Sequence, residues 1–204
     1  MWIIFAIIVI VIAAYFFLRQ RPKSTAVDLS AVPPQFVVVD VETTGLDSTI
    51  HQIIEIGAVK VNRESDHHTT FQVLVKPNSK LPKKITEMTG ITTEMLEREG
   101  ESPEVAMAGF LEFVGSLRLV AFNAPFDLAF LSRAAAQIDK KIENPVSDAL
   151  DMARRAWPGR RSYRLADLSR GGGLVTKGNH RSLRDCQLTI TVYCAAASKL
   201  RSVH

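Results

Sequence analysis

The apolar residues that follow residue 35 form patterns typical of strands. In residues 36–45, four apolar residues lead into Asp40-Val41-Glu42, and a turn at Gly45 follows. A valine-rich run of this kind predicts a central strand that is buried on both faces. Residues 52–61 and 67–76 predict two further strands, the second by strict alternation. The short links between the three favour an antiparallel meander.

The rest of the chain predicts mainly helices. Ser102 and Pro103 combine a capping residue with a proline at the first helical position. The predicted helices cover residues 82–89, 103–116, 125–138, 151–157, 163–170 and 181–200, and the predicted strands residues 117–122 and 146–150. Strands first, followed by strand–helix alternation, predict an α/β fold in which helices flank both faces of a mixed sheet.

A charge-free apolar run, residues 2–18, precedes this domain. A transmembrane helix needs about 20 such residues. Arg19, Arg21 and Lys23 follow the run, which predicts an N-out orientation with the main domain in the cytoplasm. A cleaved signal peptide is the alternative, but it requires basic residues before the run and small residues after it. We expect a single-pass anchor at 1–18 in a bacterial inner membrane, a proline-containing tether at 19–34 and a catalytic domain at 35–204.

Length, charge and cysteine content narrow the class of protein. The chain of 204 residues can form one ordinary domain with a full core plus an appendage. Cys186 and Cys194 are eight residues apart on one predicted helix, roughly 12 Å, which is beyond disulfide reach. We predict buried thiols in a reducing compartment. The net charge of +4 favours anionic partners.

Asp40 and Glu42 are the first candidates for chemistry. Side chains alternate along a strand, so both carboxylates point from the same face. Two close carboxylates repel one another, and a divalent cation such as Mg²⁺ or Mn²⁺ removes the conflict. The alternative is an edge strand with two solvated acids. The flanking valines favour the buried strand, and hence a metal site.

Three later residues can complete such a site. Asp127 lies in the first turn of a predicted helix that follows a strand, whereas His180 and Asp185 stand at the start of the last helix. Taken singly, these residues are weak evidence for a metal site, because an acid in the first turn of a helix is often there to interact with the helix dipole. A histidine before a helix is often a solvated loop residue.

In order and context, these segments resemble the DEDDh family of 3′-to-5′ exonucleases. The first motif corresponds to residues 40–45, the second to residues 123–127, and the third to His180 with Asp185 five residues later. Residues 53–58 and 89–92 are also similar to the family, and the resemblance spans residues 36–197. Phe122 departs from it, because many members have histidine there. The resemblance implies a ribonuclease H-like, five-stranded sheet.

The resemblance also implies roles for individual residues. Two divalent cations, Mg²⁺ or Mn²⁺, would be held by the four acids, with Asp40 as the bridge, and His180 would act as general base. Two such ions can together neutralise a phosphate, activate water and stabilise a leaving oxygen. The expected metal ligands are Asp40, Glu42, Asp127 and Asp185, and the expected substrate contacts are Thr43, Thr44, Leu46, Asn123, Phe126 and Arg181.

Basic residues are concentrated between residues 154 and 184. The set comprises Arg154, Arg155, Arg160, Arg161, Arg164, Arg170, Lys177, Arg181 and Arg184, opposed in this interval only by Asp167. A solvated helix face is one interpretation, and a surface that follows a nucleic-acid backbone is the other. Trp157 and Tyr163 could stack on bases or be buried in the core.

Together these features predict a membrane-tethered, metal-dependent 3′-to-5′ exonuclease acting on single-stranded or frayed 3′ ends. DNA is favoured as substrate by the resemblance to proofreading members. An exoribonuclease and a non-catalytic nucleic-acid-binding module are the alternatives, and a retained set of acids argues against the second. A proofreading subunit that needs a polymerase is a further possibility, which a membrane anchor disfavours. No motif identifies a protein partner.

Overall fold

The computed structural model describes residues 27–65, 67–170 and 180–202. Its centre is a five-stranded sheet in the order β3-β2-β1-β4-β5. The strands are β1 (Gln35–Thr43), β2 (Ile53–Asn62), β3 (Thr69–Leu74), β4 (Leu119–Ala121) and β5 (Val146–Asp148). The β1–β2 and β2–β3 pairs are antiparallel, whereas β1–β4 and β4–β5 are parallel. The predicted meander and mixed sheet are confirmed.

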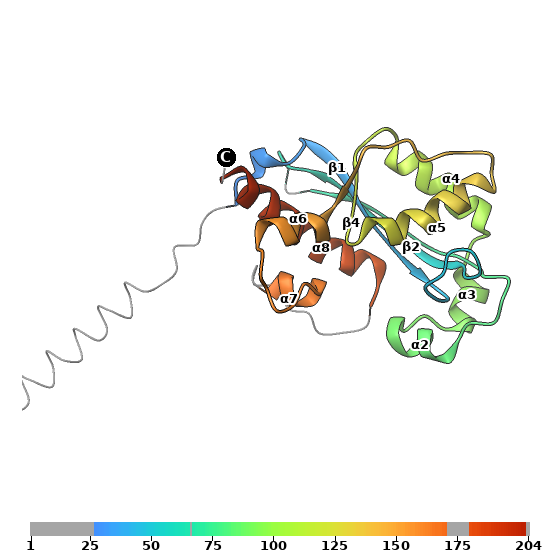
Figure 1. Ribbon diagram of the computed structural model, residues 1–204. Coiled ribbons are helices and arrows are strands. Elements are labelled where there is room, and N and C mark those ends of the chain that lie inside the picture. The colour runs from blue at the N-terminus through green and yellow to red at the C-terminus, as the bar shows by residue number, and fades with distance from the viewer. Residues whose placement is uncertain (1–26, 66, 171–179, 203–204) are drawn as a thin grey trace, which may run out of the picture.

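The helices cover both faces of this sheet, as predicted (Figure 1). They are α2 (Lys83–Thr89), α3 (Thr93–Glu99), α4 (Pro103–Val114), α5 (Ala124–Ala136), α6 (Ala149–Ala156), α7 (Leu165–Ser169) and α8 (Ser182–Arg201), with a 3₁₀ turn, η1, at Leu29–Ala31. The Ser102 hydroxyl accepts a hydrogen bond from the Val105 amide, which confirms the predicted cap. Helix α3 was not predicted, although Thr92 caps it and Glu94 lies in its first turn.

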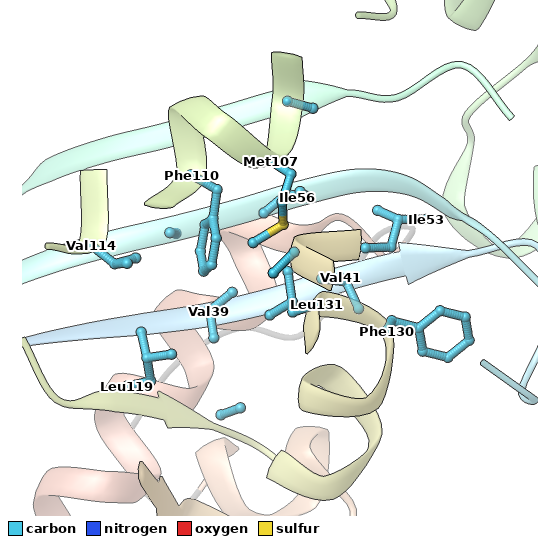
Figure 2. Packing of buried hydrophobic residues seen from close by; sticks show 14 of the residues in the cluster. Val39, Val41, Ile53, Ile56, Met107, Phe110, Val114, Leu119, Phe130 and Leu131 are labelled. Atoms are coloured by element: carbon cyan, nitrogen blue, oxygen red, sulfur yellow. The ribbon is translucent and has the colours of Figure 1, made fainter. Parts of the chain in front are cut away.

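Strand β1 is the middle strand of the sheet, and its apolar side chains are buried on both faces. Val37, Val39 and Val41 pack against α4 and α5, and Figure 2 shows Val39 and Val41 with Met107, Phe110 and Leu131. On the opposite face, Phe36 and Val38 pack against α8. Since residues alternate, Asp40 and Glu42 share this second face with Phe36 and Val38. The two acids therefore point to the side of the sheet that α8 covers.

Two other predictions concern the thiols and the membrane. Cys186 and Cys194 are free and buried, as expected. Within residues 27–65, 67–170 and 180–202, no helix has the length and apolar character that crossing a membrane requires. The predicted anchor and the first half of the predicted tether, residues 19–26, lie outside the described residues.

Candidate active site

Three carboxylates from two distant segments meet at one point. Asp40, Glu42 and Asp185 can each offer an oxygen such that these atoms lie within 4.8 Å of one another. Asp185 is in the first turn of α8, which starts at Ser182. The alternation along β1 and the docking of α8 on the same face therefore build the cluster. Carboxylate oxygens at this spacing are what a hard divalent cation prefers.

Asp127 approaches the same region from α5, on the other side of β1. Its side chain is 2% exposed, and its Oδ1 accepts a hydrogen bond of 3.1 Å from the Val41 amide. Asn123 adopts a left-handed conformation, with φ of 68°, and so turns the chain from β4 into α5. Asp127 is thus tied to the residue between the two acids of β1. Its role as a metal ligand stays a prediction.

Burial, together with repulsion between neighbouring carboxylates, raises the pKa values of Asp40, Glu42 and Asp127. Burial, and then the neighbouring Asp127 and Glu42, hold the pKa of Asp40 well above its ordinary value. Burial, reinforced by Asp185, raises the pKa of Glu42 to about 7, and burial raises that of Asp127 to about 8. A bound cation removes this penalty, because it stabilises the ionised forms. The residues present therefore suit a divalent cation.

Without metal, the protein is expected to become less stable as the pH rises from about 4.5 to about 8. Glu42 and Asp127 have raised pKa values when folded, about 7 and about 8 against ordinary values of 4.5 and 3.8. In this window the folded chain binds more protons than the unfolded chain, so the free energy of unfolding falls with pH. Thermal melts in EDTA between pH 5 and 8 measure this. A melting temperature that rises over the interval contradicts it.

His180 lies at the edge of the acid cluster. Its Nδ1 is 2.9 Å from Asp185 Oδ2, and 64% of its side chain is exposed. In the tautomer that donates from Nδ1 to the Asp185 carboxylate, the other ring nitrogen, Nε2, is an acceptor. The His180 amide also donates to the Met88 carbonyl of α2, at 3.0 Å. The imidazole is therefore held beside the acids, and its role as a general base stays a prediction.

A cleft of about 560 Å³ opens above these groups. Its lining includes the three clustered acids and His180, together with the predicted substrate contacts Thr43, Thr44, Leu46 and Phe126. Leu46 is 84% exposed, and Phe126 packs against Phe130 with ring centroids 5.1 Å apart. Asn123 is exposed at the start of α5. An exposed leucine at the margin of a cleft is suited to contact a base.

The turn after β1 is held by the hydroxyls of its threonines. Thr43 Oγ1 donates to the Gly45 carbonyl, and Thr44 Oγ1 is 3.2 Å from His51 Nδ1. A Cβ at Gly45 would lie 2.4 Å from the His51 ring, so any larger residue here would displace that ring. These hydroxyls have internal partners that hold the shape of the turn, and contacts of Thr43 and Thr44 with substrate stay predictions.

Several residues of the cleft were not predicted from the sequence. His51 lines it beside the Gly45 turn, and Lys84, Ile85 and Met88 of α2 also contribute. The one sequence feature that could have indicated a residue such as His51 is Gly45, since a glycine in a turn often allows another group to approach closely. The α2 residues gave none, because their contribution depends on how α2 packs against the end of the sheet.

Arg181 has a different neighbour from the one predicted. Its guanidinium makes an ion pair with Glu55, a wholly buried residue of β2, at 2.6 Å. Both residues line a separate hollow of about 330 Å³. A contact between Arg181 and substrate therefore stays a prediction.

The other predicted basic residues of the described chain lie mostly on the surface of α6, α7 and their link. Arg154, Arg155, Arg160, Arg161, Arg164 and Arg170 are exposed, whereas Lys177 lies outside the described residues. Arg155 pairs with Asp151 and Arg170 with Asp167. Trp157 and Tyr163 are partly buried against the cluster of Ala153, Leu168 and Val192, and Tyr163 donates its hydroxyl to the Trp157 carbonyl. Of the two predicted alternatives, the structure therefore favours packing of these two rings in the core over stacking on bases.

Known proteins similar to this chain include one of about its own length and others that are much longer. The chain is 34% identical over 185 residues to the DNA polymerase III subunit epsilon of Aquifex aeolicus, and the match covers 90% of each. It is 35% identical over 167 residues to the PolC-type DNA polymerase III of Clostridium perfringens. That match covers 82% of this chain and 11% of the polymerase, so the chain spans about a tenth of the PolC-type enzymes.

Solved structures share the fold. Exonuclease I of E. coli in complex with a dT13 oligonucleotide has a TM-score of 0.72 at 19% identity, covering 84% of this chain and 42% of that one. Exonuclease X in complex with 5′ overhanging duplex DNA has a TM-score of 0.62 at 24% identity. The family model described as exonuclease (RNase_T) matches residues 37–193. The chain therefore belongs to the exonuclease family, and the resemblance of its motifs to the DEDDh-type 3′-to-5′ exonucleases is confirmed.

Proposed function

We propose that this protein is a metal-dependent 3′-to-5′ exonuclease that releases mononucleotides from single-stranded or frayed 3′ ends, with DNA as the favoured substrate. One observation carries the proposal. Asp40, Glu42 and Asp185 converge within 4.8 Å, and His180 lies 2.9 Å from Asp185, all on the lining of one open cleft. Cation ligands and an oriented base on the same accessible surface are what phosphodiester hydrolysis requires.

The residues that would hold the cations are Asp40, Glu42, Asp127 and Asp185. Their oxygens are hard ligands, which favours Mg²⁺ or Mn²⁺ over softer metals. When bound, such ions neutralise charge on the phosphate and make the attacking water more acidic. The cluster alone has an excess of negative charge, and it would repel a phosphodiester. Cation binding and substrate binding are therefore expected to be linked.

The protein side chains would then orient the substrate and move one proton. His180 accepts a proton from the attacking water at Nε2, while its Nδ1 proton remains bonded to Asp185. The backbone of residues 43–45 and the exposed Leu46 would hold the terminal nucleotide in the cleft. Apolar contact with a base tolerates any sequence, because every base has an apolar face. We expect little base specificity.

The comparisons support DNA over RNA as the substrate. The relative that matches over 90% of its length is named as a DNA polymerase III subunit, and solved structures of the same fold contain DNA oligonucleotides. None of the contacts described above distinguishes a 2′-hydroxyl. DNA is thus the favoured substrate, and an exoribonuclease is an outcome that the experiment must separate.

The test is release of mononucleotides from oligonucleotides labelled at the 3′ end. DNA and RNA of the same sequence are compared in Mg²⁺, in Mn²⁺ and in EDTA. The proposal expects immediate release of labelled mononucleotide from DNA with either metal, and none in EDTA. Faster release from RNA would reassign the substrate. Binding of DNA without any release would identify a non-catalytic module.

We propose further that the exposed arginines of α6, α7 and their link bind the phosphate backbone of the substrate. Both helices pack on α8, whose first turn carries Asp185 (Figure 1). Replacing Arg154 and Arg161 together by glutamine should raise KM several-fold, with little change in kcat. The slope of log KM against log salt should fall by about 0.7 for each phosphate that the variant no longer neutralises. The control is replacement of Lys140 and Lys141, which are exposed in the link between α5 and β5. An unchanged salt slope would contradict this assignment.

We also propose that residues 1–18 anchor the enzyme in a bacterial inner membrane, with the catalytic domain in the cytoplasm. The support is the charge-free run of residues 2–18 and the arginines that follow it. The full chain should stay in the membrane fraction after washing with alkaline carbonate, whereas a chain lacking residues 1–22 should be released and active. Release of the full chain by the wash would show that residues 1–18 do not anchor the protein.

A further inference from the structure

A second buried carboxylate lies beside the acid cluster. Glu55 of β2 is directly opposite Glu42 in the β1–β2 pairing, so both point to the face that α8 covers. Glu55 is wholly buried, with none of its surface exposed. Two acids in this position repel one another unless one has its own counter-charge. Glu55 has one, and the donors come from the start of α8.

The hydrogen bonds to Glu55 tie three segments together. Arg181 donates from Nε at 3.0 Å and from a terminal nitrogen at 2.6 Å. Ser182 donates from its amide at 2.9 Å and its hydroxyl at 2.8 Å, and Gln72 of β3 donates from Nε2 at 3.0 Å. Burial favours the neutral acid, but these bonds hold the pKa of Glu55 below its ordinary value. The carboxylate is therefore an ionised, fully bonded anchor point for α8.

The sheet is also shaped to receive the same residues of α8. Gly57 lies two residues after Glu55, on the same face of β2, and is paired with Asp40. A Cβ at Gly57 would lie 2.3 Å from Ser182 Oγ and 2.8 Å from the Leu183 amide nitrogen. Any side chain there would force α8 away from the sheet. A steric feature and a set of hydrogen bonds thus independently fix the position of Ser182.

The fixed residues lie between the two functional residues of this segment. Arg181 directly follows His180, and its carbonyl accepts a hydrogen bond of 3.0 Å from the Asp185 amide. We propose that Glu55 is a positioning residue that holds Arg181 and Ser182, and thereby places Asp185 and His180 against Asp40 and Glu42. This inference rests on the proposed function only because that function makes Asp185 a cation ligand and His180 the base for the attacking water. Glu55 itself is expected to contact neither the cation nor that water, since its oxygens accept hydrogen bonds from α8 and β3.

A purely structural ion pair would behave differently. Loss of such a pair destabilises the fold, because one charge remains buried without its partner, but each folded molecule keeps its activity. Loss of a positioning group also weakens the site in molecules that remain folded. For groups that orient metal ligands, the typical loss is about 10-fold to 100-fold in metal affinity or activity. The metal affinity of the folded molecules therefore distinguishes a positioning role of Glu55 from a purely structural one.

The experiment is calorimetric titration of the full-length protein with Mn²⁺ alone, followed by nuclease kinetics on the same samples. Glu55→Gln should weaken Mn²⁺ binding about 10-fold or more and lower kcat by a similar or larger factor. KM for DNA should stay within about threefold, because the cleft lining is retained. Glu101→Gln is the matched control, since this exposed acid lines the same hollow as Arg181. It should bind Mn²⁺ as the wild type does.

Each outcome decides the inference. If folded Glu55→Gln binds Mn²⁺ with wild-type affinity, Glu55 does not position the site. If that variant does not fold, Ser182→Ala decides instead, because it removes only the hydroxyl bond to Glu55. Mn²⁺ binding weakened threefold or more supports the inference, and unchanged binding overturns it. Wild-type protein that binds Mn²⁺ but releases no nucleotide would refute the proposed function alone.

Discussion

Replacing Asp40 by asparagine is expected to reduce nucleotide release by roughly a thousandfold. Asp40 shares the cluster with Glu42 and Asp185, and the charge of Asp127 also acts on it. Bound cations stabilise the transition state by several kcal/mol, and a loss of about 4 kcal/mol corresponds to that factor in rate. The measurement is the single-turnover rate on 3′-labelled single-stranded DNA at saturating Mn²⁺.

The fold should tolerate this change. The pKa of Asp40 is raised, so the ionised group opposes folding at neutral pH, and asparagine removes that charge. We expect a metal-free melting temperature at pH 8 that equals or exceeds that of the wild type. Asp139→Asn is the matched control, because Asp139 is exposed, lies beyond α5 and has a positive φ that asparagine tolerates. A folded Asp40→Asn enzyme with normal turnover would exclude the cluster as the catalytic site.

Replacing His180 by glutamine should lower kcat by about a hundredfold to ten-thousandfold, the range typical of a missing general base. Glutamine can still donate a hydrogen bond to Asp185, but it cannot accept a proton from water. The acids are unchanged, so Mn²⁺ affinity and KM should remain within about twofold of the wild type. Stopped-flow or quench kinetics, with Mn²⁺ titration of the same protein, measure both quantities.

The His180→Gln variant is informative because its kcat should fall while its affinity for Mn²⁺ stays unchanged. His67→Gln serves as the control, because His67 is exposed in the link between β2 and β3. If His180→Gln lost metal binding along with activity, the imidazole would be supporting Asp185 rather than removing a proton. If it retained full activity, another group would have to be the base, and His51 is the other histidine that lines the cleft.

Much of the site could be predicted because short-range rules determine it. The period of a strand places Asp40 and Glu42 on one face without any knowledge of the fold. The position of Asp185 in the first turn of α8 follows from the predicted helix start. The motif order then implied that the segments meet, which the geometry confirms for Asp40, Glu42 and Asp185.

The parts that were not predicted depend on contacts between distant segments. Glu55 gave no sign of its role, because its partners Arg181 and Ser182 are more than 120 residues away in the chain. The lining that α2 supplies to the cleft depends in the same way on tertiary packing. Helix α3 is different, since Thr92 and the acidic residue that follows were a local signal that could have been used.

We expect the acids of β1, α5 and α8 to form one binding site for a pair of divalent cations. Anomalous diffraction from crystals grown with Mn²⁺ and a mononucleotide would locate these ions. We expect two peaks about 4 Å apart, with Asp40 bound to both and Glu42, Asp127 and Asp185 completing the ligands. Crystals that contain the nucleotide but show no Mn²⁺ peak within bonding distance of Asp40 would contradict this expectation.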